Sequence, residues 1–335
     1  MKRMLVWLLV LTMLCGCNSK DVPTSNIDAS PAEPSGSTTI PSAPESGPAS
    51  MPENSTTDQP ADPVPVPPAE PPEQELPPAV LIPAREIITY TVERDICSTN
   101  ITTEDGIELA RVIYRLPRLQ AIGAAGEIVT EGINPERSRA LEIMAAFNAN
   151  FDPWRQEDKS LREMVMEDYT YRSDAFKMGM YYADELDFSH WQTEKLISIR
   201  ADSYSYYGGA HPNTEMFGWN FDLESGTYIN ALAISHDEAE FRTLVAEELV
   251  RMADERAAAL QQEPDSLYWA DYRNILANWS DYPVVFDETG MTVRYSAYEL
   301  GSYAAGPHEF TLSYEFLQPH LGDYGRMLLG LPPAA

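Results

Sequence analysis

The fold of this chain is decided by the stretch EKLISIRADSYSYYGGAHPNTEMFGWNFDL, residues 194–223. Its first half, Glu194–Tyr207, is rich in β-branched and aromatic residues, which predicts one long strand. The strand should end at Gly208 and Gly209, because glycine permits positive φ or a close backbone approach. A second strand is expected over Phe217–Leu223. The stretch therefore predicts two neighbouring strands of one sheet joined by a glycine loop.

Strands and helices occur in runs on both sides of this stretch and do not alternate strictly. That order favours an α+β fold, in which an antiparallel sheet packs against helices, over a doubly wound fold. Turn residues such as those at Glu104-Asp105-Gly106 separate the expected strands. Further strands are expected over Glu86–Glu93, Ile107–Leu116, Thr227–Ile229, Pro283–Phe286, Met291–Tyr295 and Phe310–Tyr314.

Helical spacing of apolar residues marks four other segments. The first should begin after Asn134, which is an N-cap residue followed by Pro135. Ser235 or His236 is expected to cap the longest helix, whose acidic first turn suits the helix dipole. The helices are expected after Asn134, with Leu141, Met144, Ala145, Phe147 and Asn148 on one face, and over Trp154–Tyr171, Asp237–Gln262 and Ser266–Asn278.

The N-terminus has the pattern of a bacterial export signal, residues 1–16. Lys2 and Arg3 precede the apolar run Leu5–Leu14, which is shorter than the roughly 20 residues that a transmembrane helix needs. The run ends in Leu-Cys-Gly-Cys, which matches a lipobox. We therefore expect cleavage before Cys17 and lipidation of its thiol, which would anchor the chain to the extracytoplasmic face of a cell membrane.

Residues 17–84 differ sharply from the rest of the chain in composition. About 17 of the 27 prolines lie here, together with many Ser, Thr and Glu residues and almost no aromatic ones. Such a segment buries too little apolar surface to offset its chain entropy. We therefore predict a disordered, semi-rigid tether that holds a folded head of about 250 residues away from the membrane.

Charge and cysteine content exclude several classes of protein. The formal net charge of −29 argues against a nucleic-acid partner, since such a partner requires Lys and Arg against its phosphates. Only Cys97 would remain in the mature chain beside the lipidated Cys17, so no intramolecular disulfide is expected. We expect Cys97 to be a small buried hydrophobe, although a reactive thiol is the alternative.

Three motifs resemble a known family in their order and spacing. They are Tyr206-Tyr-Gly-Gly-Ala-His-Pro-Asn213, Asn220-Phe-Asp-Leu-Glu-Ser-Gly226 and Tyr298-Glu-Leu-Gly-Ser-Tyr-Ala-Ala-Gly306. Together they are similar to the C-terminal ectodomain of RsiV, a lysozyme-sensing anti-sigma factor. The segment before them resembles, more weakly, the N-terminal domain of the deacetylase PdaC.

This resemblance implies two α+β domains, a PdaC-like one over residues 85–187 and an RsiV-like one over residues 188–328. We expect neither sigma-factor control nor deacetylation, because no cytoplasmic segment and no catalytic deacetylase domain is recognised in the chain. What the resemblance implies is an extracytoplasmic, non-enzymatic binding head. Its partner would be a basic lysozyme-like protein or, alternatively, peptidoglycan or another envelope glycan.

The expected binding residues lie in two loops. The first set is Tyr204, Tyr206, Tyr207, Gly208, Gly209, His211, Pro212 and Asn213, and the second is Tyr298 and Tyr303. Tyrosine commonly anchors interfaces and stacks on sugars, although sheet packing is the alternative role. Residues 85–335 carry a net charge of about −22, which would attract a basic partner or simply keep the head soluble.

His211 is the most distinctive single residue, since it lies between two glycines and a proline. We expect it to hydrogen-bond its own turn and to lock adjacent strands, with a partner contact or a hydrolytic centre as the alternatives. The sequence has no nucleophile elbow and no phosphate loop, so no catalytic residue is assigned. The other histidines lack metal-ligand spacing, so neither a metal nor a cofactor is expected.

Overall fold

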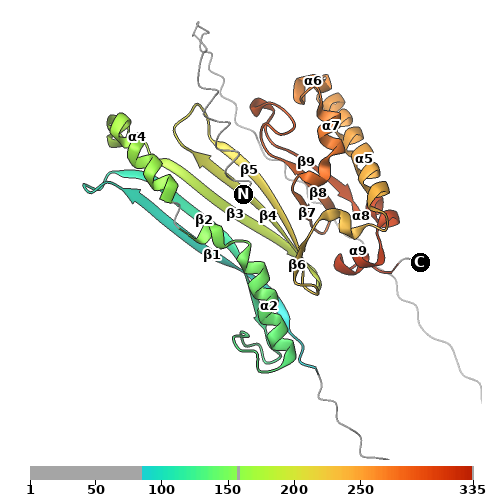
Figure 1. Cartoon of the computed structure of the whole chain (residues 1–335). Coiled ribbons are helices and arrows are strands. Elements are labelled where there is room, and N and C mark those ends of the chain that lie inside the picture. The colour runs from blue at the N-terminus through green and yellow to red at the C-terminus, as the bar shows by residue number, and fades with distance from the viewer. Residues whose placement is uncertain (1–84, 157–158, 334–335) are drawn as a thin grey trace, which may run out of the picture. The chain divides into compact units, whose positions relative to one another are not determined.

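The computed structural model describes residues 85–156 and 159–333. The predicted signal segment, Cys17 and the predicted tether lie outside these residues. The described residues form a six-stranded sheet, a three-stranded sheet and the helices that cover them (Figure 1). This confirms the prediction of an α+β fold in which sheets pack against helices.

The larger sheet has its strands in chain order, from β1 at one edge to β6 at the other. All neighbours are antiparallel except β2 and β3, which are parallel because helices cross over between them. The expected pair around the glycine loop is β4 and β5, with Tyr204 opposite Thr214. The strands are β1 (Thr89–Thr102), β2 (Glu108–Ile122), β3 (Tyr182–Gln192), β4 (Leu196–Tyr206), β5 (Asn213–Asp222) and β6 (Thr227–Ile229).

Three helices cover one face of this sheet, namely α2 (Pro135–Ala149), α3 (Asp152–Arg155) and α4 (Lys159–Lys177). The Asn134 side chain caps α2 by accepting a hydrogen bond from the Arg137 backbone N–H, as predicted. The expected face of α2 was partly wrong. Its buried side chains are Ala140, Ile143 and Phe147, whereas Ala145 is exposed.

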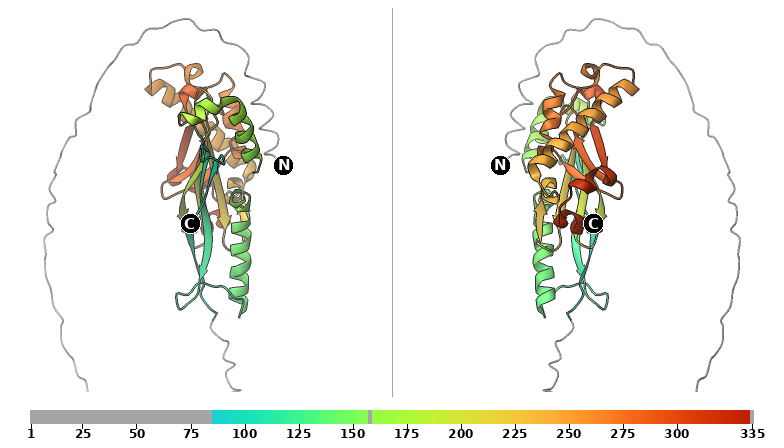
Figure 2. Two further views of the ribbon diagram at one scale, coloured as in Figure 1. Left: turned by 90° about the vertical axis from the view of Figure 1, so that its left-hand side faces the viewer. Right: turned by 90° about the vertical axis from the view of Figure 1, so that its right-hand side faces the viewer.

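The smaller sheet comprises β7 (Val284–Phe286), β8 (Gly290–Tyr295) and β9 (His308–Ser313). Every residue of β8 is buried, because β8 lies in the middle of this sheet with the larger sheet on one side and α5 on the other (Figure 1); Figure 2 views these layers from the two ends of the stack. The helices of this half are α5 (Glu238–Ala259), α6 (Pro264–Leu267), α7 (Tyr272–Ala277), α8 (Tyr314–Leu317) and α9 (Asp323–Leu328), with 3-10 turns at Ala231–Ile234, Trp279–Asp281, Tyr303–Ala305 and Gln318–His320.

The cap of α5 differs from the prediction. Asp237 is the N-cap, and its carboxylate accepts hydrogen bonds from the backbone N–H groups of Ala239 and Glu240. Ser235 and His236 are engaged elsewhere, since the Ser235 hydroxyl donates to the Leu232 carbonyl and the His236 ring contacts the His320 carbonyl. Aspartate is as good an N-cap residue as serine, so Asp237, which directly precedes the first residue of α5, takes the N-cap position.

Two residues determine how the two sheets pack together, namely a buried arginine that hydrogen-bonds across them and a glycine that leaves room between them. Arg294 on β8 is fully buried, and its guanidinium donates to the carbonyls of Ala201 and Phe217 and to the carboxylates of Asp202 and Glu309. Beside it, a Cβ on Gly218 would lie 2.7 Å from the Val284 carbonyl oxygen. Strand β7 can therefore approach β5 this closely only because residue 218 has no side chain.

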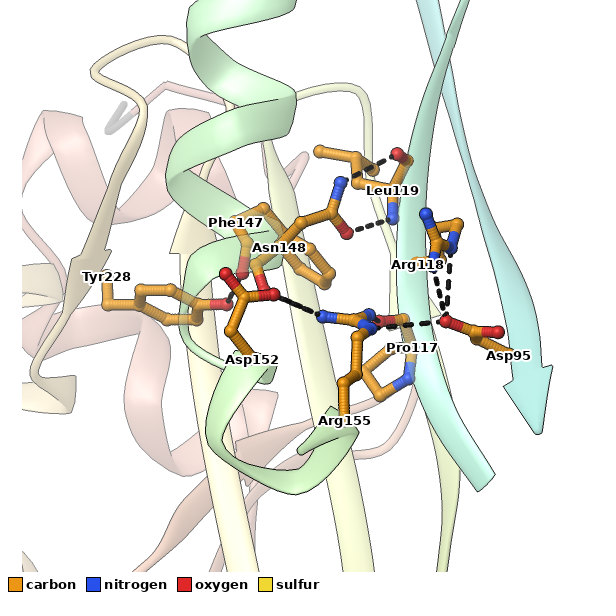
Figure 3. A network of polar contacts seen from close by, with 9 residues as sticks. All are labelled: Asp95, Pro117, Arg118, Leu119, Phe147, Asn148, Asp152, Arg155 and Tyr228. Atoms are coloured by element: carbon orange, nitrogen blue, oxygen red, sulfur yellow. Dashed lines mark hydrogen bonds and ion pairs between the residues drawn. The ribbon is translucent and has the colours of Figure 1, made fainter. Parts of the chain in front are cut away.

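A polar network fastens α2 and α3 to the β1–β2 hairpin (Figure 3). The Asn148 side-chain amide accepts from the Leu119 N–H at 2.9 Å and donates to the Leu119 carbonyl at 3.2 Å. Arg155 donates to the carbonyls of Asn148 and Pro117 and pairs with Asp95. The pairing of β2 with β3 stops at Tyr114, so these side chains satisfy backbone groups that no neighbouring strand reaches.

Strand β3 was not predicted from the sequence, nor were the short helices α8 and α9, and the predicted domain boundary lies inside β3. Residues 187 and 188 are consecutive positions of β3, and the neighbours of β3 come from both predicted segments. The division into two domains stays a prediction. Cys97 on β1 is half-buried and packs against the core under α2, and burial together with the nearby Asp95 charge raises the pKa of its thiol.

Candidate functional site

The first candidate loop connects β4 to β5. Gly208 has φ +79°, and a Cβ there would lie 2.8 Å from a guanidinium nitrogen of Arg172, so glycine is required at this position, as predicted. For Gly209 the prediction was wrong, since its φ is not positive and the nearest atom to an added Cβ is 3.7 Å away. The Gly209 carbonyl instead accepts a hydrogen bond from the Tyr206 hydroxyl, which holds the loop against its own strand.

The second candidate loop connects β8 to β9. It contains Tyr298, one of the few described residues other than glycine with positive φ, at +70°. Its middle is fixed by Gly301, because a Cβ there would lie 2.3 Å from the Leu267 carbonyl oxygen. The Ser296 hydroxyl accepts a hydrogen bond from the Met216 N–H on β5, which ties the start of this loop to the strand that follows the first loop.

The two loops meet through aromatic rings. The His211 ring stacks on Tyr303 with ring centroids 3.7 Å apart and an angle of 18° between the planes. The Tyr298 hydroxyl lies 3.1 Å from His211 Nε2, and the Trp269 indole N–H donates to the Tyr298 carbonyl. We call His211, Trp269, Tyr298 and Tyr303 the aromatic cluster. It brings together His211, Tyr298 and Tyr303, which the sequence predicted for one binding site, and adds Trp269, which it did not.

Both ring nitrogens of His211 have partners. Nδ1 lies 3.0 Å from the Pro212 carbonyl oxygen, which can only accept, so Nδ1 carries the proton. Nε2 then accepts from the Tyr298 hydroxyl. The imidazole therefore hydrogen-bonds its own turn, as expected, but it fastens the second loop and not an adjacent strand.

The aromatic cluster lies at the surface and has acidic neighbours. Tyr298 is 48% exposed and Trp269 is 39% exposed. Glu299 follows Tyr298 and accepts from the Ser296 N–H, and burial together with the charge of Glu215 raises its pKa. Exposed amphipathic rings beside carboxylates are the usual anchors of a protein interface with a basic partner.

The remaining candidate residues do not join this cluster. A separate groove of about 570 Å³ is lined by Tyr181, Tyr204 and Tyr206. Tyr207 points to the opposite face of β4, where its ring packs edge-on to the buried Tyr182, so its role is packing. Asn213 is exposed, and its amide contacts Glu215 at 3.4 Å.

Two functional candidates were missed by the sequence analysis. Trp269 lies between two short helices and gives no periodic signal. Tyr181 directly precedes β3, whose alternation of buried Leu186 and Phe188 with exposed Asp187 and Ser189 could have revealed a strand. Identifying that strand would have placed Tyr181 beside Tyr204 and Tyr206.

Within residues 85–156 and 159–333, no group of three or more His, Cys, Asp or Glu side chains is arranged to hold a metal ion. None of the helices in the described part of the chain has the length and apolarity needed to cross a membrane.

No family model matches the chain, and no curated protein matches it. Two crystal structures are similar to it in fold. One is a DUF3298 family member from Bacteroides fragilis NCTC 9343, at 19% identity and a TM-score of 0.44, covering 72% of this chain and 97% of that one. The other is a DUF3298 family protein from Pseudomonas aeruginosa PAO1, at 15% identity and a TM-score of 0.39, covering 73% and 97%. The family name denotes a domain of unknown function.

Proposed function

We propose that this chain is a lipid-anchored, extracytoplasmic binding protein whose head captures a basic protein through the aromatic cluster. The observation that carries this proposal is the contact between the two loops, in which His211 holds Tyr298 and Tyr303 in one exposed group. Rings held by neighbouring rings and hydrogen bonds lose little entropy on binding, which is the property of interface hot spots. The resemblance of both loops to the RsiV ectodomain makes a lysozyme-like protein the first candidate partner.

Charge supports a basic partner. Residues 85–335 carry a net charge of about −22. Long-range attraction to a cationic protein would raise the association rate at low ionic strength and would be screened at higher salt. Lipidation at Cys17 and the Pro-rich segment would hold the head at a distance from the membrane, where an exported partner is met.

The test is a calorimetric titration of the full-length chain with a basic C-type lysozyme at low and at physiological salt. We expect saturable one-to-one binding that weakens as salt is added. Tyr298→Ala should weaken the affinity at least about tenfold, which is the usual effect of removing a hot-spot ring.

Tyr171→Ala is the matched control, because Tyr171 is 81% exposed on α4, outside the aromatic cluster. It should bind like the parent chain. Absence of heat at both salt concentrations would refute the proposed partner. Parental affinity in Tyr298→Ala would refute the proposed surface.

A further inference from the structure

The groove beside Tyr204 and Tyr206 lies on the face of the large sheet that α2 and α4 do not cover. Tyr204 is opposite Glu185 in the β3–β4 register, and Tyr206 is opposite Ala183. Opposite residues of an antiparallel pair point to the same face, so the small Ala183 leaves a hollow beside two large rings. Tyr181, just before β3, supplies a third ring.

Two hollows lie around Gly179, Met180 and Tyr181, and the groove is the one that Tyr204 and Tyr206 line. A second hollow of about 200 Å³ shares Gly179, Met180 and Tyr181 with the first, which measures about 570 Å³. The larger hollow alone is in the size range of about 300–1,000 Å³ typical of small-molecule sites. The second hollow is lined by Phe176 and Ile107 of the core under α4, so the ligand is placed in the larger hollow alone.

The rings of this groove are accessible. Tyr204 is 41% exposed and Tyr181 is 37% exposed. Each offers an apolar ring face together with a hydroxyl group that can donate and accept. Met180 is the only large aliphatic side chain of the lining, so the groove is poorly suited to a lipid chain or to the apolar face of a helix.

The charges of the groove select against an anionic ligand. Arg111 lies over the Tyr181 ring, with 4.6 Å to the centroid, and already makes three contacts to the Glu108 carboxylate. Glu185 lies among the lining residues, and no ion pair of its carboxylate is found in the described part of the chain. An unpaired carboxylate accepts hydroxyl hydrogens well and repels phosphate or sulfate.

We propose that this groove binds an uncharged oligosaccharide, with the faces of Tyr181, Tyr204 and Tyr206 against the sugar rings and Glu185 accepting from sugar hydroxyls. The chemistry fits because a sugar has apolar faces edged by hydroxyl donors. This site is separate from the aromatic cluster, so the inference does not rest on the proposed protein partner.

The test is a titration of the full-length chain with two soluble uncharged tetrasaccharides, chitotetraose and cellotetraose, followed by calorimetry. At least one should bind saturably, with an affinity that changes little with salt. Tyr204→Ala should weaken binding about tenfold, whereas Tyr204→Phe should retain most of it. Ala183→Leu should also abolish binding, because it fills the hollow.

The controls separate this inference from the proposed function. Tyr171→Ala and Tyr298→Ala should bind the tetrasaccharide like the parent chain, although Tyr298→Ala should lose the basic protein. Tyr204 lies at the surface, so its variants test the groove even where Ala183→Leu fails to fold. Failure of both glycans to bind, or parental affinity in Tyr204→Ala, would overturn the inference.

Discussion

Lowering the pH should destabilise the head through one buried histidine, His308. It is 3% exposed, and neither ring nitrogen has a hydrogen-bond partner in the described part of the chain. Its ring packs against Tyr268 at 5.1 Å between centroids, and Gly301 of the second candidate loop lies against Nε2. Burial, together with the charge of Arg256, lowers the pKa of His308 to about 4 from its ordinary 6.5.

The direction of the pH effect on stability follows from this difference between the folded and unfolded pKa values of His308. The folded state holds the neutral imidazole, whereas the unfolded chain takes up a proton as the pH falls below about 6.5. The stability that the neutral form provides is therefore complete above pH 6.5 and is lost as the pH falls toward 4. The linkage relation gives a loss of about 2 kcal/mol at pH 5 and about 3 kcal/mol at pH 4.

The assay is urea unfolding followed by tryptophan fluorescence at several pH values between 7.5 and 5. Carboxylates also titrate in the lower part of this range, so the parent chain is compared with His308→Leu, which keeps an apolar side chain of similar volume. The difference in unfolding free energy between the two should change by about 2 kcal/mol across the range.

A difference between parent and His308→Leu that stays constant within about 0.5 kcal/mol from pH 7.5 to 5 would refute the reasoning. It would mean that the His308 imidazole is solvated or partnered in solution.

Two further predictions concern contacts between elements: that between the two sheets and that between α2 and β2. Arg294→Met should cost about 3 kcal/mol of unfolding free energy, because the carbonyls of Ala201 and Phe217 lose this donor and Glu309 keeps only its pairing with Arg200. Arg251→Met should cost under about 0.5 kcal/mol, since its ion pairs are at the surface; equal midpoints in urea for the two variants would contradict this. Asn148→Ala should cost about 2 kcal/mol and speed hydrogen exchange of the Leu119 amide, because that N–H loses its acceptor. Unchanged exchange at Leu119 would show that water replaces the Asn148 carbonyl.

Much of the fold could be predicted where side-chain periodicity was strong. Strand β4, the helix after Asn134 and α5 all follow from apolar spacing and cap residues that act within a few positions of the chain. The cap of α5 was misplaced by one or two residues, because Ser235, His236 and Asp237 compete for the same position. Strand β3 was missed because its polar positions were not compared with its buried ones.

The candidate site could be predicted only in part. The two loops were recognised from their glycines and aromatic residues, and the requirement for glycine at position 208 is local. The split between the aromatic cluster and the tyrosine groove could not be predicted, since Tyr206 and Tyr207 are adjacent in sequence and point to opposite faces of β4. Which face is open depends on where the second sheet and the helices pack.

The sequence by itself determined the α+β class, the main strands and helices and the acidic charge of the head, because these depend on composition and on spacing along the chain. Tertiary structure alone decided that His211 meets Tyr298 across 87 positions and that Tyr181 joins Tyr204. It also decided that Arg294 and His308 are buried. The physical reason is that such contacts depend on strand order and layer packing, which no local pattern encodes.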